Sequence, residues 1–516
     1  MNGHSGGRHH RLKGAVNPGA VRALRMVLPI LATIAILAPL AWLWQASRVP
    51  SPYSVMDMGY LDYGGGVAPH PGGGHGGQMQ GHVHQSEPSR LITDLVVDAA
   101  RPADVRVDLV TRHETLTVGG RSISGFTVNR TSPGPEIRAS QGQLIEVHLR
   151  NESVSDGVTV HWHGVDVPNA MDGVAGVTQD AVPVGGGFTY RFVAEQAGTY
   201  WYHSHQVSNP QVVGGLLGSL VITPKSGIAQ QVDVSAVAHT YGGLRTINGK
   251  AEVLRVPARP GHRVRIRVAN TDNGPMTVWT FGSYRLLAVD GTDIHQPTEV
   301  SERSVTLTAG ARADLEVRVP GDGSAVRVQL SKASAVVIGP AGVDAPAPPQ
   351  PSADLDLLAY GSPTPLGFDP AHPDRRFDYR IGRRPGFVKG RPGMWWSING
   401  HLFPNVPTYL VREGDVVVVH IENRSGQVHP MHLHGHHVVV LARNGVAATG
   451  SPWWVDSLNV SANETYDVAF VANNPGIWMD HCHNLKHAAQ GMIAHLMYEG
   501  FDTAYRISGP ADNQPE

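Results

Sequence analysis

The decapeptide GQLIEVHLRN at residues 142–151 decides the fold, because related decapeptides occur twice more: GHRVRIRVAN at 261–270 and GDVVVVHIEN at 414–423. Each begins with glycine, continues with a run rich in β-branched residues and ends with asparagine. Such runs are typical of β-strands. A unit that recurs along a chain indicates repeated domains. The sequence therefore predicts an all-β protein with three related domains.

The spacing of the decapeptides places the three predicted domains at residues 95–225, 226–350 and 355–505. A proline-rich stretch at 346–351 marks the second boundary as a stiff, extended linker. Short strands at steady spacing favour Greek-key β-sandwiches. Residues 506–516 are expected to form a tail.

Composition limits the chemistry of the chain. Its 516 residues include 41 basic and 43 acidic side chains, a net charge of −2, so no nucleic-acid partner is indicated. One cysteine excludes an intramolecular disulfide and any cysteine-rich zinc or iron–sulfur site. The chain also has 28 histidines, so any metal chemistry must rest mainly on histidine.

The N-terminal region is expected to target the chain to a membrane rather than to form part of a folded domain. Residues 26–44 contain no charge and are just long enough to span a membrane, and basic residues precede them. We therefore expect residues 1–50 to form a cytoplasmic tail and a signal anchor, with the rest of the chain outside the cytoplasm. A cleaved signal peptide and a secreted product are the alternative, although the large residues at 42–45 make a poor cleavage site.

Residues 51–94 are expected to form a flexible linker. Methionines and histidines lie among runs of glycine between Met56 and His84, a composition that cannot build a core. Thioethers and imidazoles suit copper, so this segment is either a weak copper-collecting arm or a plain glycine-rich tether.

Four His-x-His segments are the strongest metal signal: His161-Trp-His163, His203-Ser-His205, His432-Leu-His434 and His481-Cys-His483. Residues i and i+2 of a strand project from one face, so each segment places two imidazoles side by side. The first and second segments recur as the third and fourth at constant offsets, whereas the middle domain has lost both histidines. If the outer domains meet about a pseudo-twofold axis, their eight imidazoles converge and could hold several metal ions.

Cys482 stands between two of these histidines and must face the other way. Its thiolate can therefore bind a separate metal while its backbone leads directly to two ligands of the cluster. His429, His487 and Met492 complete a His₂Cys set with a weak thioether, the donors typical of a blue-copper site. The first domain has other residues at the positions of Cys482 and His429, so only the third domain is expected to carry this metal: Ser204 and Val158.

Together, HWHG at 161–164, HSH at 203–205, HPMHLHG at 429–435 and HCHNLKHAAQGM at 481–492 resemble the copper motifs of three-domain multicopper oxidases. The resemblance covers roughly residues 95–505 and implies cupredoxin-like domains and four copper ions. It implies a type 1 copper bound by His429, Cys482, His487 and axial Met492. It also implies a type 2 copper bound by His161 and His432, and a type 3 pair bound by His163, His203, His205, His434, His481 and His483.

The resemblance also implies the reaction. Single electrons from a reducing substrate pass through Cys482, and dioxygen is reduced to water at the cluster. We expect laccase-like oxidation of phenols and aromatic amines. We also expect oxidation of Cu(I) or other metal ions. A dedicated cuprous oxidase for copper tolerance and a non-catalytic copper-binding protein are the alternatives.

Reduction of dioxygen needs four protons, so carboxylates are expected near the cluster. Asp172, nine residues after His163, matches the acidic position near the type 2 copper in this family, and an ordinary Asp-Gly turn is the alternative. Many bacterial members have Glu-Asp where this chain has alanines at 488–489. Proton delivery on the type 3 side is then expected to use another group or water. Asp480 is a candidate for this role, unless its side chain points into the opposite layer.

Overall fold

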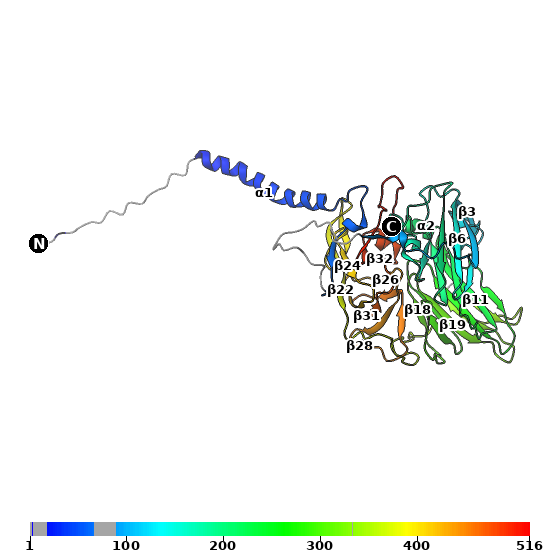
Figure 1. Ribbon diagram of the computed structural model, residues 1–516. Coiled ribbons are helices and arrows are strands. Elements are labelled where there is room, and N and C mark those ends of the chain that lie inside the picture. The colour runs from blue at the N-terminus through cyan, green and yellow to red at the C-terminus, as the bar shows by residue number, and fades with distance from the viewer. Residues whose placement is uncertain (1–2, 4–17, 67–88, 333) are drawn as a thin grey trace.

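The computed structural model describes residues 3, 18–66, 89–332 and 334–516, and β-strands dominate it (Figure 1). The three decapeptides form the equivalent strands β6 (Leu144–Asn151), β14 (Arg263–Asn270) and β25 (Val416–Asn423). Each pairs in parallel with the first long strand of its own unit and antiparallel with a later one. The predicted all-β fold class is therefore confirmed.

The shared ends of the decapeptides have a structural reason. The opening glycine adopts the left-handed conformation in all three copies, with φ of +90°, +82° and +92° at residues 142, 261 and 414. Side chains disfavour this conformation, so glycine recurs. The closing asparagine is buried and donates to main-chain carbonyls; Asn270 Nδ2 reaches Leu307 O at 3.1 Å and Thr308 O at 2.9 Å.

The first sandwich consists of two four-stranded sheets with the orders β4-β3-β6-β8 and β5-β10-β9-β7. Trp162 and Tyr190 are buried in the core between them. The strands are β3 (Val105–Val118), β4 (Arg121–Val128), β5 (Ile137–Ser140), β6, β7 (His161–His163), β8 (Gly187–Val193), β9 (Gly198–His203) and β10 (Leu217–Thr223).

The second sandwich has a six-stranded sheet, β12-β11-β14-β19-β16-β17, and a five-stranded sheet, β13-β21-β20-β15-β18. Its strands are β11 (Val232–Tyr241), β12 (Leu244–Ile247), β13 (Leu254–Pro257), β14, β15 (Met276–Thr280), β16 (Arg285–Val289), β17 (Thr292–Asp293), β18 (Val305–Leu307), β19 (Arg312–Arg318), β20 (Val326–Leu330) and β21 (Ser334–Gly339). Its buried side chains continue into those of the third sandwich, so the two share one core.

The third sandwich has a seven-stranded sheet, β23-β22-β25-β31-β27-β28 with β29 on β27, and a six-stranded sheet, β1-β24-β33-β32-β26-β30. The strands are β1 (Tyr60–Asp62), β22 (Arg375–Val388), β23 (Arg391–Ile398), β24 (Pro407–Val411), β25, β26 (His429–Leu433), β27 (Val438–Arg443), β28 (Val446–Ala447), β29 (Trp453–Val455), β30 (Ser457–Val460), β31 (Thr465–Val471), β32 (Ile477–Cys482) and β33 (Ile493–Tyr498).

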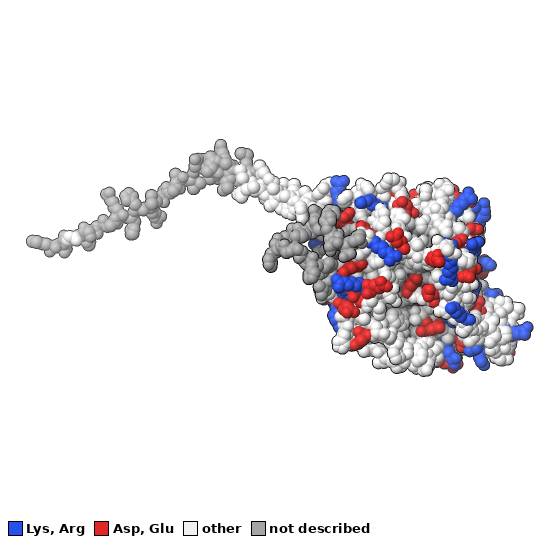
Figure 2. All heavy atoms as spheres, in the orientation of Figure 1, with Lys and Arg blue, Asp and Glu red and all other residues white. Residues whose placement is uncertain are grey.

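Helices are few in the described chain. The long helix α1 (Pro18–Ala46) projects away from the body (Figure 1). Its segment Val27–Ala46 is exposed, uncharged, and long and apolar enough to cross a membrane; Figure 2 shows it as an uncharged extension of a body whose visible face carries mixed charges. The shorter helices are α2 (Ser208–Val213), α3 (Leu485–Ala489) and the 3₁₀ turns η1 (Val55–Asp57), η2 (Ile92–Asp94) and η3 (Asn169–Met171).

The structure differs from the flexible linker predicted for residues 51–94. Strand β1 pairs with β24, and β2 (Arg90–Leu91) pairs with β34 (Phe501–Asp502). Val55 and Met58 are buried against the third sandwich, so apolar side chains hold the ends of the segment in place. The histidines and the methionine between residues 70 and 84, the predicted copper-collecting arm, lie outside the described residues.

Residues 506–516 also differ from the predicted tail, because they pack on the first sandwich. Asn513 accepts from Ala181 N at 2.8 Å and donates to Asp180 Oδ1 at 2.7 Å, and Gln514 N donates to Gln206 Oε1 at 2.8 Å. In Figure 1 the C-terminal end lies where the first and third sandwiches meet, beside α2 and β32.

We predict that Asn270→Ala destabilises the second sandwich by about 2 kcal/mol, because buried carbonyls lose their donor. Thermal unfolding of the copper-free chain, followed by circular dichroism, should show a midpoint several degrees lower. The exposed Glu252→Ala in the same sandwich is the control and should leave the midpoint unchanged. An unchanged midpoint for Asn270→Ala would mean that water replaces the asparagine amide.

Candidate metal centres

Eight histidines converge where the first and third sandwiches meet. In the first sandwich β7 pairs antiparallel with β9, which places His161 opposite His203. In the third, β26 pairs antiparallel with β32, which places His432 opposite His481. All eight predicted cluster histidines are buried: His161, His163, His203, His205, His432, His434, His481 and His483.

The two halves of this centre face each other at short range. His161 Nε2 of the first sandwich lies 3.5 Å from His432 Nε2 of the third. Within the third sandwich, His434 Nε2 lies 3.2 Å from His481 Nε2. The rings of His163 and His432 stack with centroids 3.8 Å apart. A metal–imidazole bond is about 2.0 Å long, so nitrogens at these separations can share one metal ion.

Other ring nitrogens of the centre have no hydrogen-bond partner within the described chain: His163 Nδ1, His203 Nε2, and both nitrogens of His205 and His483. Burial, aided by neighbouring imidazoles, lowers the pKa of each of these rings well below its usual value. The rings are therefore neutral at pH 7 and keep lone pairs for a metal. Imidazole nitrogen suits copper, so the donor set fits the metal that the sequence motifs imply.

A second, smaller centre lies in the third sandwich. Cys482 Sγ is 3.6 Å from Nδ1 of both His429 and His487, whose Nδ1 atoms are 3.2 Å apart. Burial raises the pKa of the Cys482 thiol, so a bound cation is needed to hold it as a thiolate. Met492 is buried, and its carbonyl accepts from the Cys482 amide at 3.2 Å. His487 is half-buried and brings this centre to the surface.

Trp396 on β23 supports the small centre. Its ring lies 4.4 Å from that of His487 and 4.8 Å from that of His429, between centroids. Its Nε1 donates to Gln490 Oε1 at 2.8 Å, which fixes the indole against both histidines. The sequence gives no signal for this role, because aromatic residues are common in strands.

Asp172, the carboxylate expected near the large centre, contacts two of its histidines. Its Oδ1 lies 3.0 Å from His161 Nδ1, and its Oδ2 lies 3.0 Å from His434 Nδ1. The next residue, Gly173, has φ of +78°, and a side chain there would collide with Val160 O. The two interpretations of Asp172 are therefore compatible, because the Asp-Gly turn orients its carboxylate toward the two histidines.

A buried ion pair that the sequence analysis missed supports the opposite side of the centre. Asp456 Oδ1 lies 3.1 Å from His163 Nε2, and Asp456 O accepts from His432 Nδ1 at 2.8 Å. Arg312 donates to both carboxylate oxygens, at 2.7 and 2.5 Å. Burial alone would raise the pKa of Asp456, but the Arg312 guanidinium holds it well below its usual range, so the carboxylate is charged.

Glu516 is the second residue that the sequence analysis missed. Its side chain is 2% exposed, and its Oε1 lies 3.2 Å from His481 Nδ1 and 3.8 Å from His205 Nε2. Ser208 Oγ donates to Oε2 at 2.7 Å. Burial raises the pKa of Glu516 to about 8. A carboxyl group thus lies beside these two histidines although residues 488–489 supply none.

Asp480, the candidate from sequence, lies elsewhere. Its side chain lines a small cavity between the two sheets of the third sandwich, together with Tyr379 and Phe470. Burial raises the pKa of Asp480 to about 7. The strand alternation that turns His481 toward the metal centre therefore turns Asp480 into the opposite layer.

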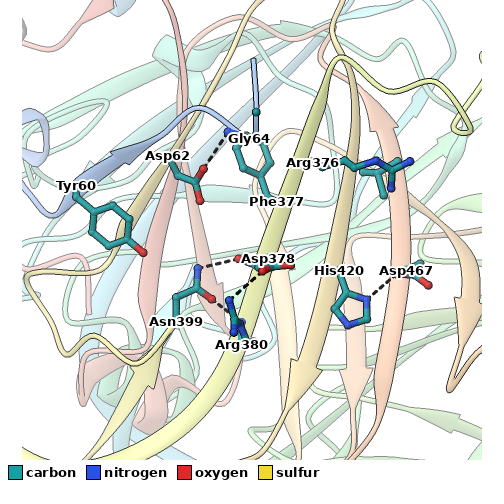
Figure 3. A pocket seen from close by; sticks show the side chains of 12 residues that line it. Tyr60, Asp62, Gly64, Arg376, Phe377, Asp378, Arg380, Asn399, His420 and Asp467 are labelled. Carbon is teal, nitrogen blue, oxygen red and sulfur yellow. Dashed lines mark hydrogen bonds and ion pairs between the residues drawn. The ribbon is translucent and has the colours of Figure 1, made fainter. Parts of the chain in front are cut away.

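A hollow of about 500 Å³ on the outer face of the seven-stranded sheet contains none of the predicted ligands (Figure 3). Its polar side chains bond to one another: His420 Nδ1 lies 2.7 Å from Asp467 Oδ1, and Arg380 donates to Asp378 at 2.9 Å. These side chains thus have hydrogen-bond partners within the hollow. The two histidine centres are therefore the better candidates for the functional site.

The sequence matches that of known proteins. Residues 110–227 and 370–500 match the family profiles described as multicopper oxidase. The multicopper oxidase MmcO of Mycobacterium tuberculosis is 28% identical over 78% of this chain and 89% of its own length. Laccase-1 of Botryotinia fuckeliana is 27% identical over 74% of this chain and 80% of its own length.

Solved structures agree. A multi-copper oxidase from Pseudomonas thermotolerans superposes with a TM-score of 0.63 at 27% identity, covering 77% of this chain and 100% of that one. The cupredoxin-like sandwiches expected from sequence are confirmed by this likeness. With its buried histidine centres, the chain belongs to the multicopper oxidase family: a copper enzyme that couples oxidation of a reducing substrate or metal ion to reduction of dioxygen.

Proposed function

We propose that the protein is a laccase-like multicopper oxidase with four copper ions that oxidises phenols and aromatic amines, and also Cu(I) or other metal ions. One observation carries the proposal: Cys482 Sγ faces His429 and His487, while the flanking His481 and His483 belong to the eight-histidine centre. A reductant at the half-buried His487 is thereby joined to the buried centre through one residue.

We propose the metal sets that the copper motifs of this chain imply by resemblance. We assign the type 1 site to His429, Cys482, His487 and Met492, and the type 2 site to His161 and His432. The type 3 pair is assigned to His163, His203, His205, His434, His481 and His483. Two contacts support two sets within the last group: His434 Nε2 lies close to His481 Nε2, and the ring of His163 meets that of His483 edge to face at 4.8 Å between centroids.

Copper in these sites would supply one-electron transfer at type 1 and four-electron reduction of dioxygen to water at the cluster. The protein supplies orientation and exclusion of water. Asp172 fixes His161 and His434, and Asp456 fixes His163 and His432. Cys482 offers a covalent route between the centres, and the burial of all eight histidines keeps bulk water from the reduction site.

A dedicated cuprous oxidase is the second candidate. A Cu(I) acceptor site needs several thioethers close together. Of the methionines whose side chains the structure describes, only Met394 is exposed, at 53%. This favours a broad reductant range over a specialised copper-efflux enzyme.

We further propose domain bounds of 95–225, 226–350 and 355–505, which contain the strands of the three sandwiches from β3 to β21 and from β22 to β33. We also propose that α1 anchors the enzyme with its N-terminus inside and its body outside the cytoplasm. The exposed apolar surface of α1 supports an anchor, and removal of α1 as a signal peptide is the alternative.

Replacement of the thiolate tests the electron route. Cys482→Ser should abolish the blue absorption and nearly all substrate oxidation, because hydroxyl is a poor copper ligand in a His₂ set. Copper analysis should show that the eight-histidine centre stays loaded. Persistent substrate oxidation by this variant would contradict electron entry at type 1.

Oxygen uptake at equal copper loading tests the substrate range. The purified protein should consume dioxygen with a methoxyphenol, and also with Cu(I) and Fe(II). The proposed function fails if copper-loaded protein consumes dioxygen with neither a methoxyphenol nor Cu(I). Heat-treated, copper-loaded protein controls for oxidation by released copper.

Removal of residues 513–516 tests whether the last residues close the type 3 side. A chain ending at Asp512 should bind copper about tenfold more weakly, because groups that orient metal ligands contribute about that much. Its copper loss to a chelator should be faster and its unfolding midpoint lower. Glu516→Gln keeps the side-chain volume and provides a milder comparison. Equal copper retention in the full-length and shortened chains would contradict the prediction.

A further inference from the structure

The β22–β23 hairpin lies over the small centre. In its antiparallel register Arg383 stands opposite Trp396, and Arg384 opposite Trp395. Successive residues of a strand project from opposite faces, so Arg383 and Arg384 lie on different faces of the hairpin. Arg383 Cζ lies 4.7 Å from the Trp396 ring centroid, and the same ring packs against His487. The exposed guanidinium of Arg383 is thus separated from the half-buried His487 by one aromatic ring.

The surroundings of this guanidinium are cationic. From Tyr379 to Gly400 the chain has five basic side chains and no carboxylate, and α3 adds Lys486 beside His487. Within the described residues no carboxylate lies within ion-pair distance of Arg383, whereas the neighbouring Arg380 pairs with Asp378. The charge of Arg383 therefore faces an incoming reductant unneutralised.

We propose that Arg383 makes the type 1 mouth selective for anionic aromatic reductants, such as carboxylated phenols, over metal cations. The inference rests on the proposed function and narrows its substrate class. Each phenol gives up one electron and its hydroxyl proton and leaves as a phenoxyl radical. Four such events and one dioxygen yield two waters, so electrons and protons balance.

The solvent exposure of Arg383 sets the expected size of its effect on the oxidation rate. A solvent-exposed charge acts through water and is screened over about 8 Å at physiological salt. Such charges act mainly on the encounter rate. We therefore expect about a three- to tenfold effect on the rate with an anionic substrate at low salt. The effect should disappear at high salt.

The test compares one reaction in three proteins: the copper-loaded full chain, Arg383→Gln, and Arg384→Gln as the matched control. Arg384 is also exposed and is one residue away, but it projects from the other face and donates to Gly400 O. Anaerobic bleaching of the blue absorption is followed with syringate, with its uncharged analogue syringol, and with Fe(II). Ratios between variants cancel the intrinsic reactivity of each substrate.

Arg383→Gln should slow bleaching by syringate about three- to tenfold, leave syringol within about twofold and speed Fe(II). Arg384→Gln should behave as the unaltered protein. Equal slowing with all three substrates, or the same effect from Arg384→Gln, would overturn the inference. Failure of both phenols to bleach the unaltered protein would instead count against the proposed function.

Binding provides a readout that needs no electron transfer. Trimethoxybenzoate has no oxidisable hydroxyl, so its binding to the copper-free full chain can be followed by ligand-observed NMR. Arg383→Gln should weaken this binding, whereas Arg384→Gln should not. Equal binding by all three proteins would overturn the role of Arg383, whatever the outcome with oxidisable phenols.

Discussion

The ion pair between Arg312 and Asp456 is the constraint on which the large centre depends. Arg312 belongs to the second sandwich, Asp456 to the third, and Arg312 Nε also donates to Thr199 O of the first, at 3.1 Å. Both side chains are fully buried. Removal of either partner would leave an uncompensated charge in the interior, which costs about 3–5 kcal/mol. The pair therefore ties three sandwiches to one arrangement at the point where the histidines converge.

This arrangement also decides which nitrogen each histidine offers to a metal. Asp456 occupies His163 Nε2 and His432 Nδ1, so Nδ1 of His163 and Nε2 of His432 remain for coordination. Asp172 occupies Nδ1 of His161 and His434 in the same way. Carboxylates that orient ligating histidines fix their tautomers as well as their positions. The second sandwich, which has lost both His-x-His segments, still serves the reaction because it supplies Arg312.

The sequence was sufficient for the strands and for the histidines that converge, but not for the residues that support those histidines. The decapeptides and His-x-His segments are local patterns, and their periodicity alone predicts strands and paired imidazoles. Asp456, Arg312 and Glu516 have no local pattern, since their roles arise from contacts between residues more than 100 positions apart, such as Arg312 with Asp456 or Glu516 with His205. The linker was predicted too long for a related reason: glycine content hid the few apolar residues, including Val55, that hold its ends against the third sandwich.

The two outer sandwiches differ in whether they offer donors for a mononuclear metal. In the first sandwich Val158 is buried where the third has His429, and Ser204 Oγ donates to Gln211 Oε1 at 2.6 Å where the third has a free thiol. An apolar side chain and a satisfied hydroxyl leave no donor set for a mononuclear metal. The duplicated strands thus retain both halves of the histidine centre. A short helix follows in each case, α2 after β9 and α3 after β32, but only α3 carries a histidine, His487. Because Trp396 of the cationic β22–β23 hairpin packs on His487 of that helix, the proposed electron entry and the charge proposed to select the reductant lie on the same side of the molecule.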